Sequence, residues 1–215
     1  MRQRTLLIGG IAAVAAAAVL AATAIAIGLA GSAIGRPGGM MGGFLGAGGG
    51  DIGMDRAVAA AQSAASYRGS GLAVDEVIEF SNGYYASIRE KSTGVGAFEI
   101  LIDRATGRVT REPGPDMMWN TRYGVMGGGM MGGAYAGSGV MSVSSSQARD
   151  IAQRWLDANE PGTKASAPDP FYGYYTVDFQ RDGKLAGMLS VNGSSGAVWF
   201  HSWHGSFVEV RDLGA

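Results

Sequence analysis

The spacing of apolar and polar positions changes along the chain, from helical spacing to strand-like runs, and each spacing predicts a type of secondary structure. Between residues 54 and 67 apolar side chains recur at helical spacing, which predicts an amphipathic helix with Val58, Ala61 and Ala65 on its buried side. Three strand-like runs follow, at 72–80, 84–90 and 98–102. Asn82-Gly83 joins the first two, a pair that favours tight hairpin turns because both turn positions need a positive φ. The pattern predicts one helix packed on a small antiparallel sheet.

The same order of elements returns later in the chain. Ser144 and Gln147 have the spacing of a capping box and predict a helix that runs to about Ala158. Strand-like runs follow at 171–177, 187–191 and 197–200. The halves correspond closely, because Gly83-Tyr84-Tyr85 returns 90 residues later as Gly173-Tyr174-Tyr175. A helix followed by three strands, repeated at nearly constant spacing, predicts two similar units.

A long uncharged stretch precedes both units. Residues 6–30 contain no charged side chain, and as a helix at about 1.5 Å per residue they would exceed the apolar core of a bilayer, about 30 Å. This predicts a transmembrane helix with the lipid bilayer as its partner, and a long cleaved signal peptide is the alternative. Arg2 and Arg4 on the short side, against Arg36 on the other, predict a single-pass cell-membrane protein with a cytoplasmic N-terminus and an extracytoplasmic bulk.

The predicted fold class is therefore α+β, with an N-terminal transmembrane helix followed by two small helix-plus-antiparallel-sheet units. Two tracts rich in glycine and methionine are expected to be linkers, because ordering glycine costs much backbone entropy. The predicted organisation is a cytoplasmic tip and anchor at 1–36, a linker at 37–53, a first unit at 54–116, a linker at 117–141 and a second unit at 142–215.

Helix, hairpin, then a strand ending in Asp-x-x-Thr-Gly-x-Val resembles the PepSY domain, a small module of peptidase propeptides and cell-envelope proteins. The stretch from Leu101 to Val109 carries this motif best, and the second copy has Asn and Ser in place of the Asp and Thr. The resemblance covers residues 54–112 and, with less of the motif, 142–203. It implies a non-catalytic envelope module that inhibits peptidases or modulates another partner, and it supplies no catalytic residues.

Composition excludes several classes of protein. The 215 residues include no Cys, which rules out disulfides, thiolate metal sites and cysteine nucleophiles. The formal net charge is −1, so we do not expect a nucleic-acid partner, because such binding needs a basic surface. The sequence has no Gly-x-Ser-x-Gly, His-Glu-x-x-His or phosphate-binding Gly-x-x-x-x-Gly-Lys motif, so we do not expect an enzyme.

Methionine is the unusual residue, with 11 in the chain and most of them in or beside the glycine tracts. Thioether sulfur is a soft ligand that favours Cu(I), and the two histidines could complete a mixed site. The candidate metal ligands, with Cu(I) as candidate cofactor, are Met117, Met118, Met126, Met130, Met131, His201 and His204.

Each candidate has a simpler interpretation. Methionine pairs can fill gaps or contact partners as adaptable apolar side chains, and Met117, Met118 and Trp119 can form a sulfur–aromatic cluster. The two histidines follow a strand, where positions i and i+3 point to opposite faces, and they can form an aromatic end to the second sheet.

The tyrosines at 84, 85, 172, 174 and 175 alternate along strands, so we expect one set in the core and the other on an exposed face that suits a protein or peptide partner. The expected function is a membrane-anchored, extracytoplasmic, non-catalytic binding or regulatory module that modulates a peptidase or another envelope partner. The alternative is an extracytoplasmic protein that binds or handles Cu(I) through methionine pairs and histidine.

Overall fold

The computed structural model describes residues 50–125 and 141–214. The first half forms α1 (Met54–Arg68), β1 (Leu72–Phe80), β2 (Gly83–Glu90), β3 (Gly96–Asp103), β4 (Val109–Arg111) and the short α2 (Pro115–Met118). The second half forms α3 (Ser145–Asn159), β5 (Lys164–Ala165), β6 (Asp169–Phe171), β7 (Tyr174–Arg181), β8 (Lys184–Asn192), β9 (Val198–Phe200) and β10 (Phe207–Asp212). In each half a helix precedes the strands, as the sequence predicts.

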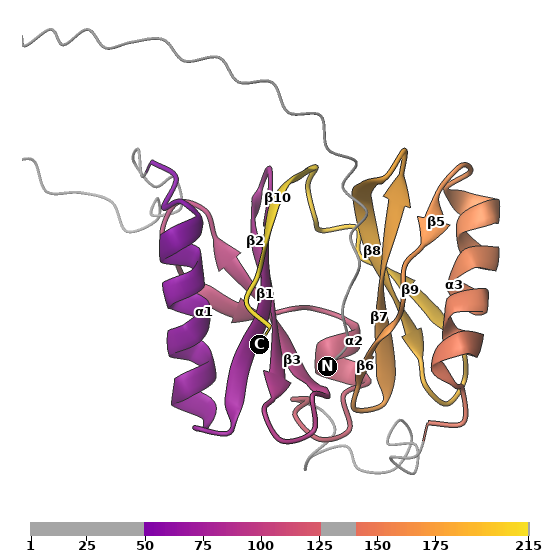
Figure 1. Cartoon of the computed structure of the whole chain (residues 1–215), viewed down its shortest axis with the longest axis horizontal. Coiled ribbons are helices and arrows are strands. Elements are labelled where there is room, and N and C mark those ends of the chain that lie inside the picture. The colour runs from indigo at the N-terminus through magenta and orange to yellow at the C-terminus, as the bar shows by residue number, and fades with distance from the viewer. Residues whose placement is uncertain (1–49, 126–140, 215) are drawn as a thin grey trace, which may run out of the picture. The chain divides into compact units, whose positions relative to one another are not determined.

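The ten strands of the described residues all belong to one mixed sheet. Its order is β10-β1-β2-β3-β6-β7-β8-β9, with β4 beside β3 and β5 beside β7 (Figure 1). The halves join where Gly96 of β3 pairs in parallel with Phe171 of β6. This approach needs glycine, since a Cβ at residue 96 would lie 2.4 Å from the Phe171 ring. The predicted fold class, with two small helix-plus-antiparallel-sheet units, is therefore wrong, because the described strands form one mixed sheet in a single domain.

The last strand lies at the far edge of the first half. β10 pairs antiparallel with β1, from Glu76↔Asp212 to Phe80↔Phe207, with one irregularity between Glu79 and Phe80. The chain therefore leaves β9 at one end of the strand order and returns to β1 at the other end. The repeat pattern of the sequence predicts neither the strand nor its partner.

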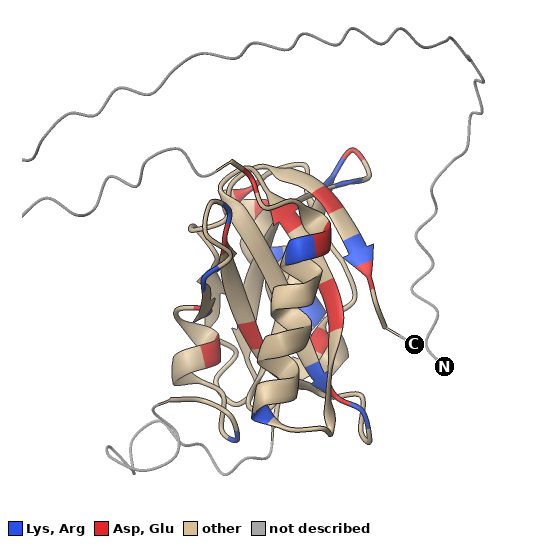
Figure 2. Ribbon diagram, turned by 90° about the vertical axis from the view of Figure 1, so that its left-hand side faces the viewer, with Lys and Arg blue, Asp and Glu red and all other residues tan. Residues whose placement is uncertain are grey.

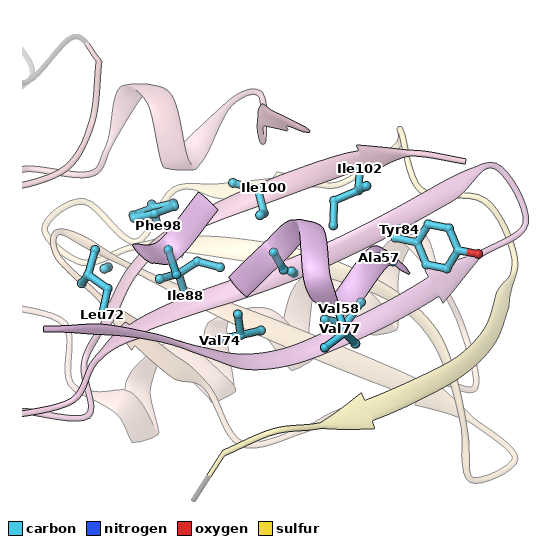
Figure 3. Close-up of a cluster of buried hydrophobic side chains, with 14 of the residues drawn as sticks. Ala57, Val58, Leu72, Val74, Val77, Tyr84, Ile88, Phe98, Ile100 and Ile102 are labelled. Atoms are coloured by element: carbon cyan, nitrogen blue, oxygen red, sulfur yellow. The ribbon is translucent and has the colours of Figure 1, made fainter. Parts of the chain in front are cut away.

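Helix α1 covers one face of β1–β3 (Figure 3). Three small residues, Ala57, Ala61 and Ala65, are at most 2% exposed and let the helix lie close to the sheet. The sheet side of this core is larger and consists mainly of Leu72, Val74, Val77, Tyr84, Ile88, Phe98, Ile100 and Ile102. The predicted buried stripe of α1 is confirmed.

Helix α3 covers the corresponding face of the second half, and Figure 1 shows α1 and α3 on the two outer sides with the strands between them. The capping box predicted at the start of α3 is confirmed. The Gln147 backbone N–H donates to Ser144 Oγ at 3.3 Å, and the Ser144 N–H donates to Gln147 Oε1 at 2.8 Å. Ala148, Ala152 and Leu156 are completely buried on its inner side.

The remaining faces of the two halves meet each other. Ile78, Phe80 and Tyr85 of the first half form one buried cluster with Met188 of β8. Both faces of each half are therefore covered, and the predicted exposed tyrosine face is wrong, because the four residues Tyr84, Tyr85, Tyr174 and Tyr175 are at most 5% exposed. This face-to-face contact is the physical reason that the repeats form one domain, since small units gain a sufficient core only together.

The described residues contain no helix that is long and apolar enough to cross a membrane. The predicted transmembrane helix at 6–30 lies outside the described residues, as does most of the predicted linker at 37–53. The fold that the structure supports is a sheet-dominated single domain with one large mixed sheet, and its described part has three helices.

Candidate metal centre

One acidic side chain and both histidines meet between the two halves. Glu112 follows β4, His201 directly follows β9, and His204 lies in the connection to β10. One potential ligand atom from each residue lies within 4.8 Å of the others. The side chains of Glu112 and His201 are fully buried, and that of His204 is 5% exposed. The cluster is a candidate site for a metal ion.

The distances within this cluster are close to those of a metal site. Glu112 Oε1 lies 2.9 Å from His204 Nε2 and 3.4 Å from His201 Nδ1. Two ligand bonds of about 2.0–2.1 Å at a tetrahedral angle place their donor atoms about 3.3 Å apart. The two separations from Glu112 are within a few tenths of an ångström of that spacing, and the donor atoms of the two imidazoles lie within 4.8 Å of each other.

Two buried donor atoms of the cluster, Glu112 Oε2 and His201 Nδ1, have no hydrogen-bond partner among the described residues. His201 Nδ1 lies 3.4 Å from Glu112 Oε1 but does not form a hydrogen bond with it. Buried polar atoms almost always have partners, so two such atoms in one cluster point to a ligand.

The surroundings hold the ligand atoms in place. His201 Nε2 lies 3.0 Å from the Ser190 hydroxyl, and a proton on Nε2 that is donated to that oxygen leaves the Nδ1 lone pair free. The Trp203 indole N–H donates to Glu112 Oε1 at 3.0 Å. The His204 ring stacks on Phe80, with ring centroids 4.3 Å apart. These contacts fix the orientation of all three side chains.

The cluster lies beside two further buried carboxyl groups. Burial, followed by the nearby Glu112 and Asp116 carboxylates, raises the pKa of Glu99 well above its usual value. Burial also raises the pKa of Asp116 to about 6, although Arg111 opposes the shift. For Glu112, burial alone would raise the pKa, but the imidazoles of His201 and His204 lower it below its ordinary range. An added cation would favour the charged form of all three carboxyl groups.

Hydroxyl groups from both halves surround the Glu99 carboxyl. Tyr85 donates to Oε1 at 2.5 Å, Thr176 donates to the same oxygen at 2.8 Å, and Tyr174 donates to Oε2 at 2.8 Å. Because Glu99 and Tyr85 belong to the first half while Tyr174 and Thr176 belong to β7, these bonds join the halves. The Glu112 backbone N–H donates to the Glu99 carbonyl at 3.0 Å, which ties this network to the candidate metal centre.

The sequence identified two of the three residues that meet. His201 and His204 come together because the turn at Ser202 and Trp203 brings the chain back, so the opposite-face argument for a continuing strand does not apply. Glu112 was missed. It lies 92 positions before His204, and no motif in the sequence links the two.

None of the five methionine candidates belongs to the cluster of Glu112, His201 and His204: two lie in α2, and three lie outside the described residues. Met117 and Met118 belong to α2, where Met117 is half-buried and Met118 is 38% exposed. Met126, Met130 and Met131 lie outside the described residues. Trp119 packs edge-on against Trp199 with ring centroids 5.7 Å apart.

Acidic and basic positions are interspersed along the described elements rather than gathered on separate surfaces (Figure 2). Several form ion pairs, among them Arg104 with Glu79 at 2.6 Å and Arg89 with Asp75 at 2.7 Å. The concentration of buried acidic and imidazole groups around Glu112 is therefore an internal feature and not part of a charged surface.

No family model matches the sequence, and no curated protein matches it. Among solved structures, the C-terminal domain of YpeB from Bacillus megaterium is similar, with 13% identity over 70% of this chain and a TM-score of 0.26. The match spans 62% of that chain. A TM-score this low carries no argument about fold or function, so the PepSY resemblance rests on the order of elements and on the turn motif of the sequence.

Proposed function

We propose that this protein is a non-catalytic binding module of the cell envelope whose core holds one divalent metal ion of the Zn²⁺ class. The observation that carries the proposal is the pair of unpartnered buried donor atoms, Glu112 Oε2 and His201 Nδ1, in a cluster with His204. A buried polar group without a partner costs about 1–3 kcal/mol. A cation bound to His201 Nδ1 and to both oxygens of the Glu112 carboxylate would remove both costs.

The donor set favours Zn²⁺ over the Cu(I) expected from the sequence. One carboxylate and two imidazoles are common ligands of Zn²⁺, whereas Cu(I) prefers soft sulfur ligands. The sulfur ligands proposed from sequence are Met117, Met118, Met126, Met130 and Met131, of which the last three lie outside the described residues. Cu(I) binding through these methionines is therefore the competing outcome of the experiment below.

The burial of the centre supports a role without catalysis. Two of the three side chains are fully buried and the third is 5% exposed, which leaves a substrate no direct approach to the ion. The PepSY resemblance supports the modulation of a protein or peptide partner, with a peptidase as one candidate. The uncharged residues 6–30 behind Arg2 and Arg4 support a location outside the cytoplasm, which protease accessibility in intact cells that express the chain would test.

The binding experiment uses the full chain, purified in a mild detergent and freed of metal with a chelator. Competition with a chromogenic zinc indicator should give one Zn²⁺ per chain. Glu112→Gln and His204→Gln should each weaken that binding at least about tenfold, because each removes one of three ligands. Glu160→Gln changes an acidic residue that pairs with Arg181 away from the site and serves as the matched control.

Two results would overturn the metal proposal. One is the absence of stoichiometric Zn²⁺ binding, and the other is binding that Glu112→Gln and His204→Gln leave unchanged while circular dichroism shows both variants folded. Tighter binding of Cu(I) than of Zn²⁺, lost when the five candidate methionines are changed to Leu, would instead favour copper handling.

A further inference from the structure

The candidate metal centre lies on the segment that delivers the last strand to the first half. His201 and His204 belong to the connection between β9 and β10, whereas Glu112 belongs to the first half. An ion bound to all three residues would therefore fix this connection to the first half. If this connection detaches from the first half, Glu112 is the one ligand of the three that stays there.

Strand β10 itself has few apolar contacts. Val208 is 50% exposed and Val210 is 41% exposed, while Phe207 packs against the inner cluster of Ile78, Phe80, Tyr85 and Met188. Apart from Phe207, and Leu213 just after the strand, β10 depends mainly on its backbone pairing with β1 and on the Arg211–Asp55 ion pair. β10 stands at one end of the strand order, so among the described residues β1 is its strand neighbour. Segments with little apolar burial open at low free-energy cost.

The beginning of β10 is held by polar contacts near the same centre. The Asn82 side chain donates to the Trp203 carbonyl and accepts from the Gly205 N–H, both at 2.8 Å. The Trp203 indole N–H also donates to Glu112 at 3.0 Å. The position of this connection and the geometry of the centre therefore depend on each other.

We propose that metal binding at Glu112, His201 and His204 controls how firmly β10 pairs with β1. This inference rests on the proposed function. The ion binds the state in which the connection is docked, because that state brings all three ligands together, and it has little affinity for the opened state. By linkage, metal at about 100 times its dissociation constant should reduce the opened population by up to about 100-fold. Occupancy of the site thus regulates the edge strand of the sheet.

Hydrogen exchange of the full chain, read by mass spectrometry with and without Zn²⁺, tests this directly. Amides of β10 (Phe207–Asp212) should exchange up to about 100-fold more slowly with saturating Zn²⁺. The last turn of α3 carries none of the three ligands and is expected to exchange by fraying, so it serves as the internal control. His204→Gln should abolish the effect of Zn²⁺ on β10.

The reverse measurement uses a residue that is not a ligand. Phe207→Ala loosens β10 and should weaken Zn²⁺ binding about tenfold, because coupling between docking and binding is reciprocal. Ser144→Ala, which removes the cap of α3, is the control and should leave Zn²⁺ affinity unchanged.

The outcomes separate this inference from the proposed function. If Zn²⁺ binds stoichiometrically but β10 exchange stays the same, or if Phe207→Ala binds Zn²⁺ as tightly as the wild type, the coupling is refuted and the metal site stands. If Zn²⁺ does not bind the wild-type chain, both are refuted.

Discussion

The buried carboxyl of Glu99 provides the sharpest test of how the halves are held together. We predict that Glu99→Leu destabilises the protein by about 2–5 kcal/mol. Three hydroxyls donate to Glu99, and that of Tyr85 has no second acceptor among the described residues. A buried unpaired hydroxyl costs about 1–3 kcal/mol. Tyr174 and Thr176 have weaker alternatives at 3.4 Å, Asp116 Oδ1 and Ser190 Oγ, so each should cost less. Glu99→Gln keeps an acceptor and should cost under about 1 kcal/mol.

The same reasoning predicts that the effect of Tyr85→Phe changes sign with the residue at position 99. With Glu99 present, Tyr85→Phe removes a made hydrogen bond and should cost about 1 kcal/mol. In the Glu99→Leu background it removes an unsatisfied hydroxyl and should raise the free energy of unfolding. The assay is urea unfolding of the four proteins, followed by tryptophan fluorescence, as a double-mutant cycle. Equal destabilisation by Tyr85→Phe in both backgrounds would refute the reasoning.

Three further predictions concern the sheet, the second helix and pH. Gly96→Ala should cost about 1–3 kcal/mol, because its Cβ would meet the Phe171 ring, whereas Gly71→Ala, with nothing within 4 Å, should be close to neutral in the same urea assay. Ser144→Ala should lower the free energy of unfolding by about 1 kcal/mol through loss of the α3 cap; an equal loss in Ser145→Ala would contradict this. Because burial raises the pKa of Asp116 from 3.8 to about 6, the folded chain holds a proton that the unfolded chain releases, so stability should fall by about 1–3 kcal/mol as pH rises from about 4 to about 6. In Asp116→Asn, measured like the wild type with chelator present, this fall in stability with pH should vanish. If the free energy of unfolding of the variant changes with pH in parallel with that of the wild type, Asp116 is not its cause.

The local structure of each half follows from patterns along the sequence. Helical spacing of alanines predicted α1, and the Ser144 and Gln147 pair predicted the start of α3. The hairpin predicted at Asn82-Gly83 does form between β1 and β2, but its two turn residues are Ser81 and Asn82, and neither Asn82 nor Gly83 has a positive φ. These features depend on neighbouring residues, whose spacing matches the period of one helix or strand. The histidines could likewise be singled out, since they are the two in the chain.

The way in which the halves combine depends on contacts that form only in the folded chain. The second faces of the two halves cover each other and bury Tyr85, while α1 covers the opposite face and buries Tyr84, where alternation alone predicted one exposed set. The pairing of β10 with β1 and the meeting of Glu112 with His201 and His204 join residues about 90 or more positions apart. Such contacts leave no local period in the sequence, because they are chosen by the burial of whole faces and not by the preferences of neighbouring residues.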